Sequence, residues 1–296
     1  MKNEIFKIGS QIIQIEGRVD GLPPTDKIIS RFSISSPSKI DLTVYINCQS
    51  TNNASDVYKH LPMIYKDKYG MCIYSDGNKY HYEFVKDEVN YISAAYYDVS
   101  SRTAQIYIIP SNIPNNYIHL LYTTPFQLVY MQHLAFHSDS YLVHTSAISS
   151  ESGGICLCGK SGAGKTTISS LFSHNSQYKV LTDETALLEF QDGEIDVYGT
   201  PWKGSGSMFA RNESIELRRI YFISHARDKN YSERVDIGES ANQLLQQAFP
   251  YYWDKKAMTS IFIKILRTVK IVECYSLAFI PDKSVVQYIE EHLTGE

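Results

Sequence analysis

A glycine-rich segment at residues 159–166, GKSGAGKT, has the residue types that hold nucleotide phosphates. Two glycines flank four residues and are followed by lysine and threonine, which is the spacing of a phosphate-binding loop (P-loop). An apolar run, ICLC, precedes the segment and a helical pattern, TTISSLF, follows it, so we prefer this interpretation to a chance glycine turn. The predicted nucleotide-binding residues are Gly159, Lys160, Ser161, Gly162, Ala163, Gly164, Lys165, Thr166 and Thr167.

The chemistry of such a loop assigns roles to two of these side chains. The loop N–H groups and the N-terminus of the following helix would contact phosphate oxygens. Lys165 would reach the β and γ phosphates of a nucleoside triphosphate, and the Thr166 hydroxyl would ligate Mg²⁺.

Two acids, Asp183 and Glu184, stand at the end of the apolar run YKVL. If that run is a parallel strand beside the loop strand, these carboxylates lie next to Mg²⁺ and the γ-phosphate. One would ligate the metal and the other would accept the proton of an attacking hydroxyl. The alternative is a pair of solvated residues at a strand end.

His144 lies on an apolar, strand-like segment before the loop strand. A histidine there can pair with one of the two carboxylates, or it can be a core residue whose ring nitrogens are satisfied locally. Its spacing alone leaves both interpretations open.

In order and separation, His144, the loop GKSGAGKT and Thr182-Asp183-Glu184 resemble the catalytic core of HPr kinase/phosphorylase and its relatives. Those proteins share a P-loop fold related to phosphoenolpyruvate carboxykinases, and the resemblance covers about residues 141–290. It implies that Asp183 is the catalytic acid/base, that His144 pairs with it, and that Glu184 is the second acid near Mg²⁺. It also implies a homo-oligomer. We further expect ATP as the phosphoryl donor and Lys165 among the catalytic residues, but a P-loop contacts phosphates and leaves the choice between adenine and guanine open.

A second segment, Tyr198–Gly206 (YGTPWKGSG), stands where the family has a Glu-x-Arg-Gly-type sequence. It is similar to HPr-kinase-like proteins found with peptide-biosynthesis genes, including kinases that phosphorylate the C-terminal serine of lasso-peptide precursors. Lys203 or Arg211 could neutralise the charge of the transferred phosphate there. The alternative is a structural loop in which Trp202 packs.

The elements around these residues fall into two halves. Through about residue 123 the chain is a series of short β-type runs, and Asp76-Gly77-Asn78 between two of them predicts a hairpin. We therefore predict a β-rich domain over residues 1–123, a linking helix over 124–140, and an α/β P-loop kinase domain over 141–296.

Composition excludes several classes of protein. Among 296 residues, Lys plus Arg number 28 and Asp plus Glu 32, so a net charge of −4 gives no general field for nucleic acid or an anionic membrane. The first residues lack the apolar core of a signal peptide, and apolar stretches elsewhere are too short to span a bilayer. Five cysteines without a second close pair indicate reduced thiols, so we expect a cytoplasmic protein.

The site residues and the family resemblance together predict an ATP-dependent kinase that phosphorylates a serine hydroxyl of a peptide. From the resemblance of the segment at residues 198–206, we expect this peptide to be a lasso-peptide precursor. The same site would serve if the acceptor were HPr or a small-molecule alcohol. An alternative of a different class is a nucleotide-sensing binding module that changes conformation without phosphoryl transfer.

Overall fold

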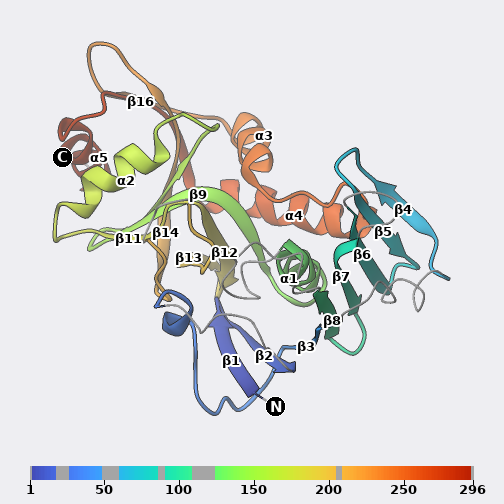
Figure 1. Ribbon diagram of the computed structural model, residues 1–296. Coiled ribbons are helices and arrows are strands. Elements are labelled where there is room, and N and C mark those ends of the chain that lie inside the picture. Colours follow the sequence, from blue (N-terminus) through green and yellow to red (C-terminus); the bar gives the residue numbers. More distant parts are fainter. Residues whose placement is uncertain are drawn as a thin grey trace. The chain divides into compact units, whose positions relative to one another are not determined.

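The computed structural model describes residues 2–17, 27–48, 60–85, 91–108, 124–204 and 209–294. The chain is mixed α/β and forms two compact units (Figure 1). Unit 1 is Met1–Ser138 with Tyr251–Ala257, and unit 2 is Asp139–Pro250 with Met258–Glu296.

In the described part of unit 1, eight strands form one sheet in the order β1-β2-β3-β8-β7-β6-β5-β4. Neighbouring strands are antiparallel except for the pairs β2–β3 and β3–β8. A short 3₁₀ helix spans Ile29–Arg31. The strands are β1 (Lys2–Ile8), β2 (Gln11–Gly17), β3 (Leu42–Cys48), β4 (Met63–Lys66), β5 (Met71–Ser75), β6 (Lys79–Val85), β7 (Tyr91–Asp98) and β8 (Thr103–Ile108).

The expected hairpin at Asp76-Gly77-Asn78 is confirmed, because it joins β5 to its antiparallel neighbour β6. The Asp76 carboxylate accepts hydrogen bonds from the N–H groups of Asn78 and Lys79 at 2.9 and 2.8 Å. Gly77 has φ +91°, a left-handed conformation that side chains with a Cβ atom rarely adopt.

Helix α1 (Thr124–His137) belongs to unit 1 and packs against β7 and β8. Its buried Gln132 accepts a hydrogen bond from the Tyr82 hydroxyl at 3.0 Å and donates one to Asp254 at 3.2 Å. Asp254 also accepts a hydrogen bond from Tyr80. Residues 251–257, which the sequence pattern assigns to the second half, therefore complete the polar core of unit 1.

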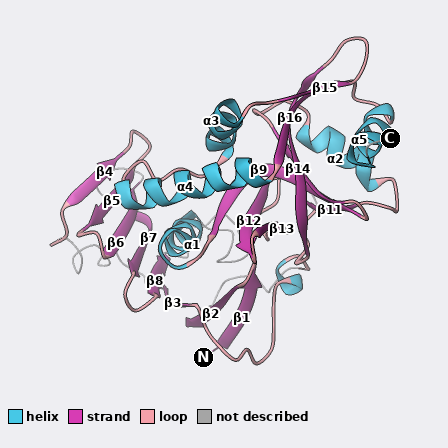
Figure 2. Cartoon of the chain, turned by 180° about the vertical axis from the view of Figure 1, so that it is seen from behind, coloured by secondary structure: helices cyan, strands magenta, loops and turns pink. Residues whose placement is uncertain are grey.

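The described strands of unit 2 also form one sheet, whose main path is β10-β9-β12-β13-β14-β16-β15. Outside that path, β11 pairs with β9, and β10 also pairs with β14. The strands are β9 (Ser140–Ser150), β10 (Gly153–Cys158), β11 (Lys179–Thr182), β12 (Thr185–Gln191), β13 (Glu194–Gly199), β14 (Ser214–His225), β15 (Tyr231–Arg234) and β16 (Glu273–Phe279). Helices α2 (Lys165–Ser173), α3 (Ile237–Gln247) and α5 (Ser284–Thr294) belong to this unit, as does α4 (Lys255–Ile271) from Met258 onward. Helices are drawn cyan in Figure 2.

Strand β9 changes partners along its length. Its first half, from Ser140 to His144, pairs with β12, and its second half pairs with β10 on one edge and β11 on the other. All of these pairings are antiparallel. His144 therefore stands at the position where β9 exchanges one set of neighbours for another.

The core of unit 2 follows from strand alternation. Ile155 and Leu157 of β10 point to one face and pack with Ile168 and Phe172 of α2. Helix α5 packs against α2 and contributes to the same cluster through Val285, Val286 and Ile289.

Cys156 and Cys158 of β10 alternate with Ile155 and Leu157 and are buried, as expected for packing residues. The cysteines whose side chains are described are free thiols, namely Cys72, Cys156, Cys158 and Cys274. In the part of the chain that the structure describes, no helix is long and apolar enough to cross a membrane.

Candidate functional site

The predicted strand–loop–helix arrangement is present around the glycine-rich segment. Strand β10 ends at Cys158, and α2 begins at Lys165. Gly162 and Gly164 have φ +81° and +97°, so both adopt conformations that favour glycine. A Cβ at Gly164 would lie 2.7 Å from the Phe279 ring, which gives a second, steric reason for glycine there.

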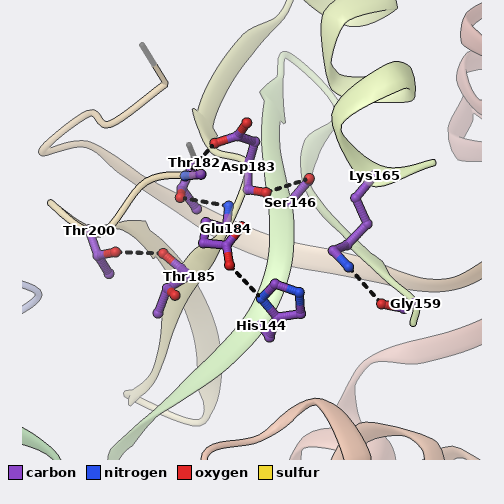
Figure 3. Close-up of polar contacts among 10 residues, drawn as sticks. His144, Ser146, Gly159, Lys165, Thr182, Asp183, Glu184, Thr185 and Thr200 are labelled. Atoms are coloured by element: carbon purple, nitrogen blue, oxygen red, sulfur yellow. Dashed lines mark hydrogen bonds and ion pairs between the residues drawn. The ribbon is translucent and has the colours of Figure 1, made fainter. Parts of the chain in front are cut away.

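Lys165 starts α2 and is buried, with its side chain directed back across the loop. Its Nζ donates a hydrogen bond to the Gly159 carbonyl at 2.7 Å (Figure 3). Burial lowers the pKa of Lys165, while the charge of Glu184 acts in the opposite direction. The ammonium group is therefore held by the loop carbonyl and lies within the electrostatic influence of Glu184.

The N-terminus of α2 has the features of an anion site. Its N-cap residue is Gly164, which provides no side chain to accept hydrogen bonds from the first turn. Thr166 and Thr167 follow in that turn and are exposed. The helix dipole and the N–H groups of this turn favour phosphate oxygens.

Asp183 and Glu184 form the turn between β11 and β12. The Glu184 N–H donates to Thr182 Oγ1 at 3.3 Å, and the Glu184 carbonyl accepts from the Thr145 N–H at 3.1 Å. The Ser146 hydroxyl donates to the Asp183 carbonyl at 3.5 Å. Both residues of the turn are thus fastened to β9.

The expected parallel strand beside the loop strand is wrong for these acids. Strand β11 pairs antiparallel with β9, and β9 lies between β11 and β10. The reason is the short turn that joins β9 to β10, which makes β9 the neighbour of β10 on that edge, while the other edge takes β14. The acids therefore approach the loop across β9.

The register of β9 brings His144 to both parts of the site. Thr185 is paired with His144, so Glu184 is adjacent to it, and Cys158 is paired with Thr145, so the loop begins beside it. His144 Nδ1 lies 3.4 Å from Glu184 Oε1. The expectation that His144 pairs with Asp183 is therefore wrong, because the ring contacts Glu184 instead. The register pairs His144 with Thr185, and Glu184 is the residue directly before Thr185.

The electrostatics of His144 combine three causes. Burial lowers its pKa most, the charge of Lys165 lowers it further, and Glu184 opposes both. The His144 side chain is 32% exposed to solvent, so His144 is not a core residue. A lowered pKa keeps the imidazole neutral at pH 7.

The segment after β13 reaches the carboxylates through Gly204. The Gly204 N–H donates to Asp183 Oδ1 at 3.5 Å, and a Cβ at Gly204 would lie 3.3 Å from Glu184 Oε2. Trp202 is buried, and Lys203 between them is half-buried. Residues 205 and 206 of the segment YGTPWKGSG lie outside the described residues.

Arg211 is fixed near the acidic turn by its backbone. Its N–H donates to the Leu181 carbonyl at 2.9 Å, two residues before Asp183. Its guanidinium is about half exposed, and Nη1 lies 3.5 Å from Glu213 Oε1. The structure thus places Arg211 beside the site with its charge paired to a surface acid.

Thr166 and Glu184, the residues predicted to hold Mg²⁺, offer two oxygen ligands. Within the described ranges, no group of three or more His, Cys, Asp or Glu side chains could hold a metal ion alone. Mg²⁺ commonly keeps several waters and takes one or two protein carboxylates together with nucleotide phosphates. The donor set therefore fits Mg²⁺ bound with a nucleotide better than a cage made by the protein alone.

Some contributors to this site were not singled out from the sequence. Thr145, Ser146 and Gly204 hold the acidic turn in place through backbone and hydroxyl contacts. Two hydroxyl residues directly after His144 were the available signal, whereas the contact of Gly204 depends on how the chain returns from β13.

No protein-family model matches the sequence, and no curated protein matches it. Among solved structures, the chain is similar to the Hpr(Ser) kinase/phosphatase from Coxiella burnetii, with 10% sequence identity and a TM-score of 0.30. That match covers 52% of this chain and 94% of the other. The likeness is too weak to carry an argument about fold or function.

Proposed function

We propose that the chain is an ATP-dependent kinase that transfers the γ-phosphoryl group to a serine hydroxyl of a peptide. The observation that carries the proposal is the convergence of Lys165, His144 and the Asp183-Glu184 turn at the mouth of the glycine-rich loop. Phosphoryl transfer depends mainly on positioning and charge stabilisation, and this group of residues supplies both.

The loop and Lys165 bind the phosphates in this proposal. The Lys165 ammonium exchanges its hydrogen bond to the Gly159 carbonyl for phosphate oxygens, because a charged acceptor makes the stronger bond. Thr166 and Glu184 would hold Mg²⁺, which neutralises charge on the β and γ phosphates when it is bound.

Asp183 is the proposed base for the acceptor hydroxyl. Its side chain is buried, and its hydrogen bond from the Gly204 N–H is long, at 3.5 Å, which leaves the carboxylate oxygens able to accept a stronger bond. Neutral His144 contacts the neighbouring Glu184 and so orients the second acid instead of the base. This division of roles differs from the one that the family resemblance implies.

The acceptor is proposed to be a precursor peptide with a C-terminal serine, as in lasso-peptide maturation. The support is the similarity of the segment at residues 198–206 to kinases of that kind, together with the position of Gly204 against both carboxylates. Lys203 would then meet the transferred phosphate or the peptide carboxylate.

Intact-mass spectrometry of a serine-ended lasso precursor peptide, incubated with the protein, ATP and Mg²⁺, tests the proposal. A phosphate adds about 80 Da to the peptide. Lys165→Ala should abolish the shift, and a peptide with alanine in place of the terminal serine should show none. Binding of ATP without a mass change on this peptide, on HPr or on small alcohols would contradict the kinase and favour a nucleotide sensor.

A further inference from the structure

A second feature of unit 2 lies on the other side of the glycine-rich loop from the acidic turn. A cavity of about 680 Å³ is bounded by loop residues 159–163, by the ends of β10 and β14, and by helix α3. Its volume is within the usual range of about 300–1,000 Å³ for small-molecule sites. No motif in the sequence pointed to it.

One row of side chains on α3 forms the polar wall of this cavity. Glu239, Gln243 and Gln247 follow one another at intervals of four residues, so they share one face of the helix, and all three line the cavity. The Gln243 amide donates to Glu239 Oε1 at 2.8 Å. We call these three residues the α3 face; Gln246, three residues after Gln243, lines the cavity beside it.

The start of α3 is fixed by a capping residue. Asp236 is its N-cap, and its carboxylate accepts hydrogen bonds from the N–H groups of Gly238 and Glu239 at 2.9 and 3.1 Å. The cap fixes the backbone that carries this row of side chains, and a preorganised backbone lowers the cost of ordering the site when a ligand binds.

The opposite side of the cavity belongs to the loop. His225, at the end of β14, donates from Nε2 to the Gly162 carbonyl at 3.2 Å, and its exposed ring lies at the cavity. An exposed imidazole held in this way can stack on a nucleobase. Cys158 and Phe222 contribute buried, less polar surface to the lining.

We propose that this cavity holds the nucleoside of the bound nucleotide and that the α3 face selects adenine over guanine. The inference rests on the proposed function, since it requires phosphates in the adjacent loop. The nucleoside is covalently attached to those phosphates, and this cavity shares the loop as a wall.

The selectivity follows from hydrogen-bonding chemistry. A glutamine amide offers one acceptor and one donor side by side, which matches the N6 amino group and N7 of adenine. Guanine presents two acceptors at the same edge, O6 and N7, and is matched by arginine or lysine instead. Among the described residues that line the cavity, Lys160 is the one lysine or arginine, and it belongs to the loop and not to the α3 face. The carboxylate of Glu239 suits a ribose hydroxyl.

Calorimetric titration with ATP, GTP and inorganic tripolyphosphate, each with Mg²⁺, tests this inference. The wild-type protein should bind ATP about tenfold or more tightly than GTP, the difference expected for about one good hydrogen bond. The double variant Gln243→Ala/Gln247→Ala should bind ATP at least about tenfold more weakly and tripolyphosphate unchanged. Asn242→Ala is the matched control, because Asn242 carries an exposed amide on the same helix and is not among the residues that line the cavity.

The outcomes separate the two proposals. If the wild-type protein binds neither ATP nor tripolyphosphate, the proposed function fails. If it binds ATP and GTP equally, or if the double variant keeps wild-type affinity for ATP, the nucleoside site is overturned. If the double variant also binds tripolyphosphate more weakly, or unfolds at a lower temperature, the single variant Gln247→Met decides. Methionine keeps the side-chain volume and removes only the amide. Unchanged ATP affinity in that variant would overturn the inference.

Discussion

His144 Nδ1 lies 3.4 Å from Glu184 Oε1, so a residue in the middle of β9 contacts the acidic turn that connects β11 and β12. Burial and Lys165 disfavour the charged imidazolium, and Glu184 favours it. The protonation of His144 therefore reports directly on the charge balance of the site.

Removing the Glu184 charge should lower the pKa of His144 further. In Glu184→Gln the opposing influence on His144 is lost, whereas burial and the Lys165 charge remain. We expect the His144 resonance in an NMR titration to move at lower pH in the variant than in the wild-type protein. Glu213→Gln is the control, since Glu213 is a surface acid paired with Lys179 and Arg211. An unchanged or raised pKa in Glu184→Gln would show that the contact does not persist in solution.

Asp183→Asn should separate binding from transfer. The amide keeps the shape of the side chain and can still meet the Gly204 N–H, but it cannot take a proton from an acceptor hydroxyl. We expect the rate of peptide phosphorylation to fall by about 10²–10⁴-fold while ATP affinity stays within a few-fold of wild type. A transfer rate close to wild type in this variant would remove Asp183 from the role of base.

Gly199→Ala should destabilise unit 2. A Cβ there would lie 2.1 Å from the Arg211 carbonyl oxygen and 2.8 Å from that of Leu181, and both are backbone atoms that cannot rotate away. We expect a loss of about 3 kcal/mol in the free energy of unfolding, measured by chemical denaturation.

Gly193→Ala is the matched comparison for that variant. Gly193 has φ +93°, and none of the described atoms lies within 4 Å of the position that a Cβ would take, so the change incurs only backbone strain of roughly 1–2 kcal/mol. If Gly193→Ala costs as much as Gly199→Ala, the close approach of residues 199 and 211 is not what requires glycine.

Lys264 should make stability rise with pH above about 8. It is buried in unit 2, its Nζ donates to the Ser140 carbonyl at 3.1 Å, and burial lowers its pKa from 10.5 to about 8. Between those two values the unfolded chain binds more protons than the folded one, so this residue's contribution to stability increases with pH over that interval. Over that interval the contribution of Lys264 to the free energy of unfolding changes by at most about 3 kcal/mol.

The measurement is the free energy of unfolding of wild type and Lys264→Met between pH 7 and 10. We expect the stability advantage of the methionine variant to shrink as pH rises, because the cost of burying a charged lysine disappears. A constant difference across that range would contradict a lowered pKa.

The parts of the site that depend on local sequence were predictable. The loop at 159–166 and the turn at 183–184 can be recognised in the sequence because each follows an apolar run. In the structure the loop joins β10 to α2, and the turn follows β11. The partner of His144 was not predictable in the same way. It depends on the strand register, and a shift of one residue exchanges Asp183 for Glu184.

Features that depend on contacts between distant segments could not be predicted from the sequence either. The position of β9 between β10 and β11 follows from pairings that no local pattern specifies. The same holds for the α3 face. From the sequence its two glutamines and one glutamate resemble ordinary surface residues, and only the fold shows that they line a cavity together with the loop.

The chain order of unit 1 has a consequence during synthesis. Tyr251 donates a hydrogen bond to the Met131 carbonyl, and Asp254 completes the contacts of Tyr80 and Gln132. Ribosomes add about 5–20 residues per second, and domains commonly fold as they emerge, N-terminal first. Here unit 1 cannot complete its polar core until residues 251–257, which are made after residues 139–250, have left the ribosome. Tyr80 and Gln132 therefore gain their contacts to Asp254 only after most of unit 2 has been synthesised.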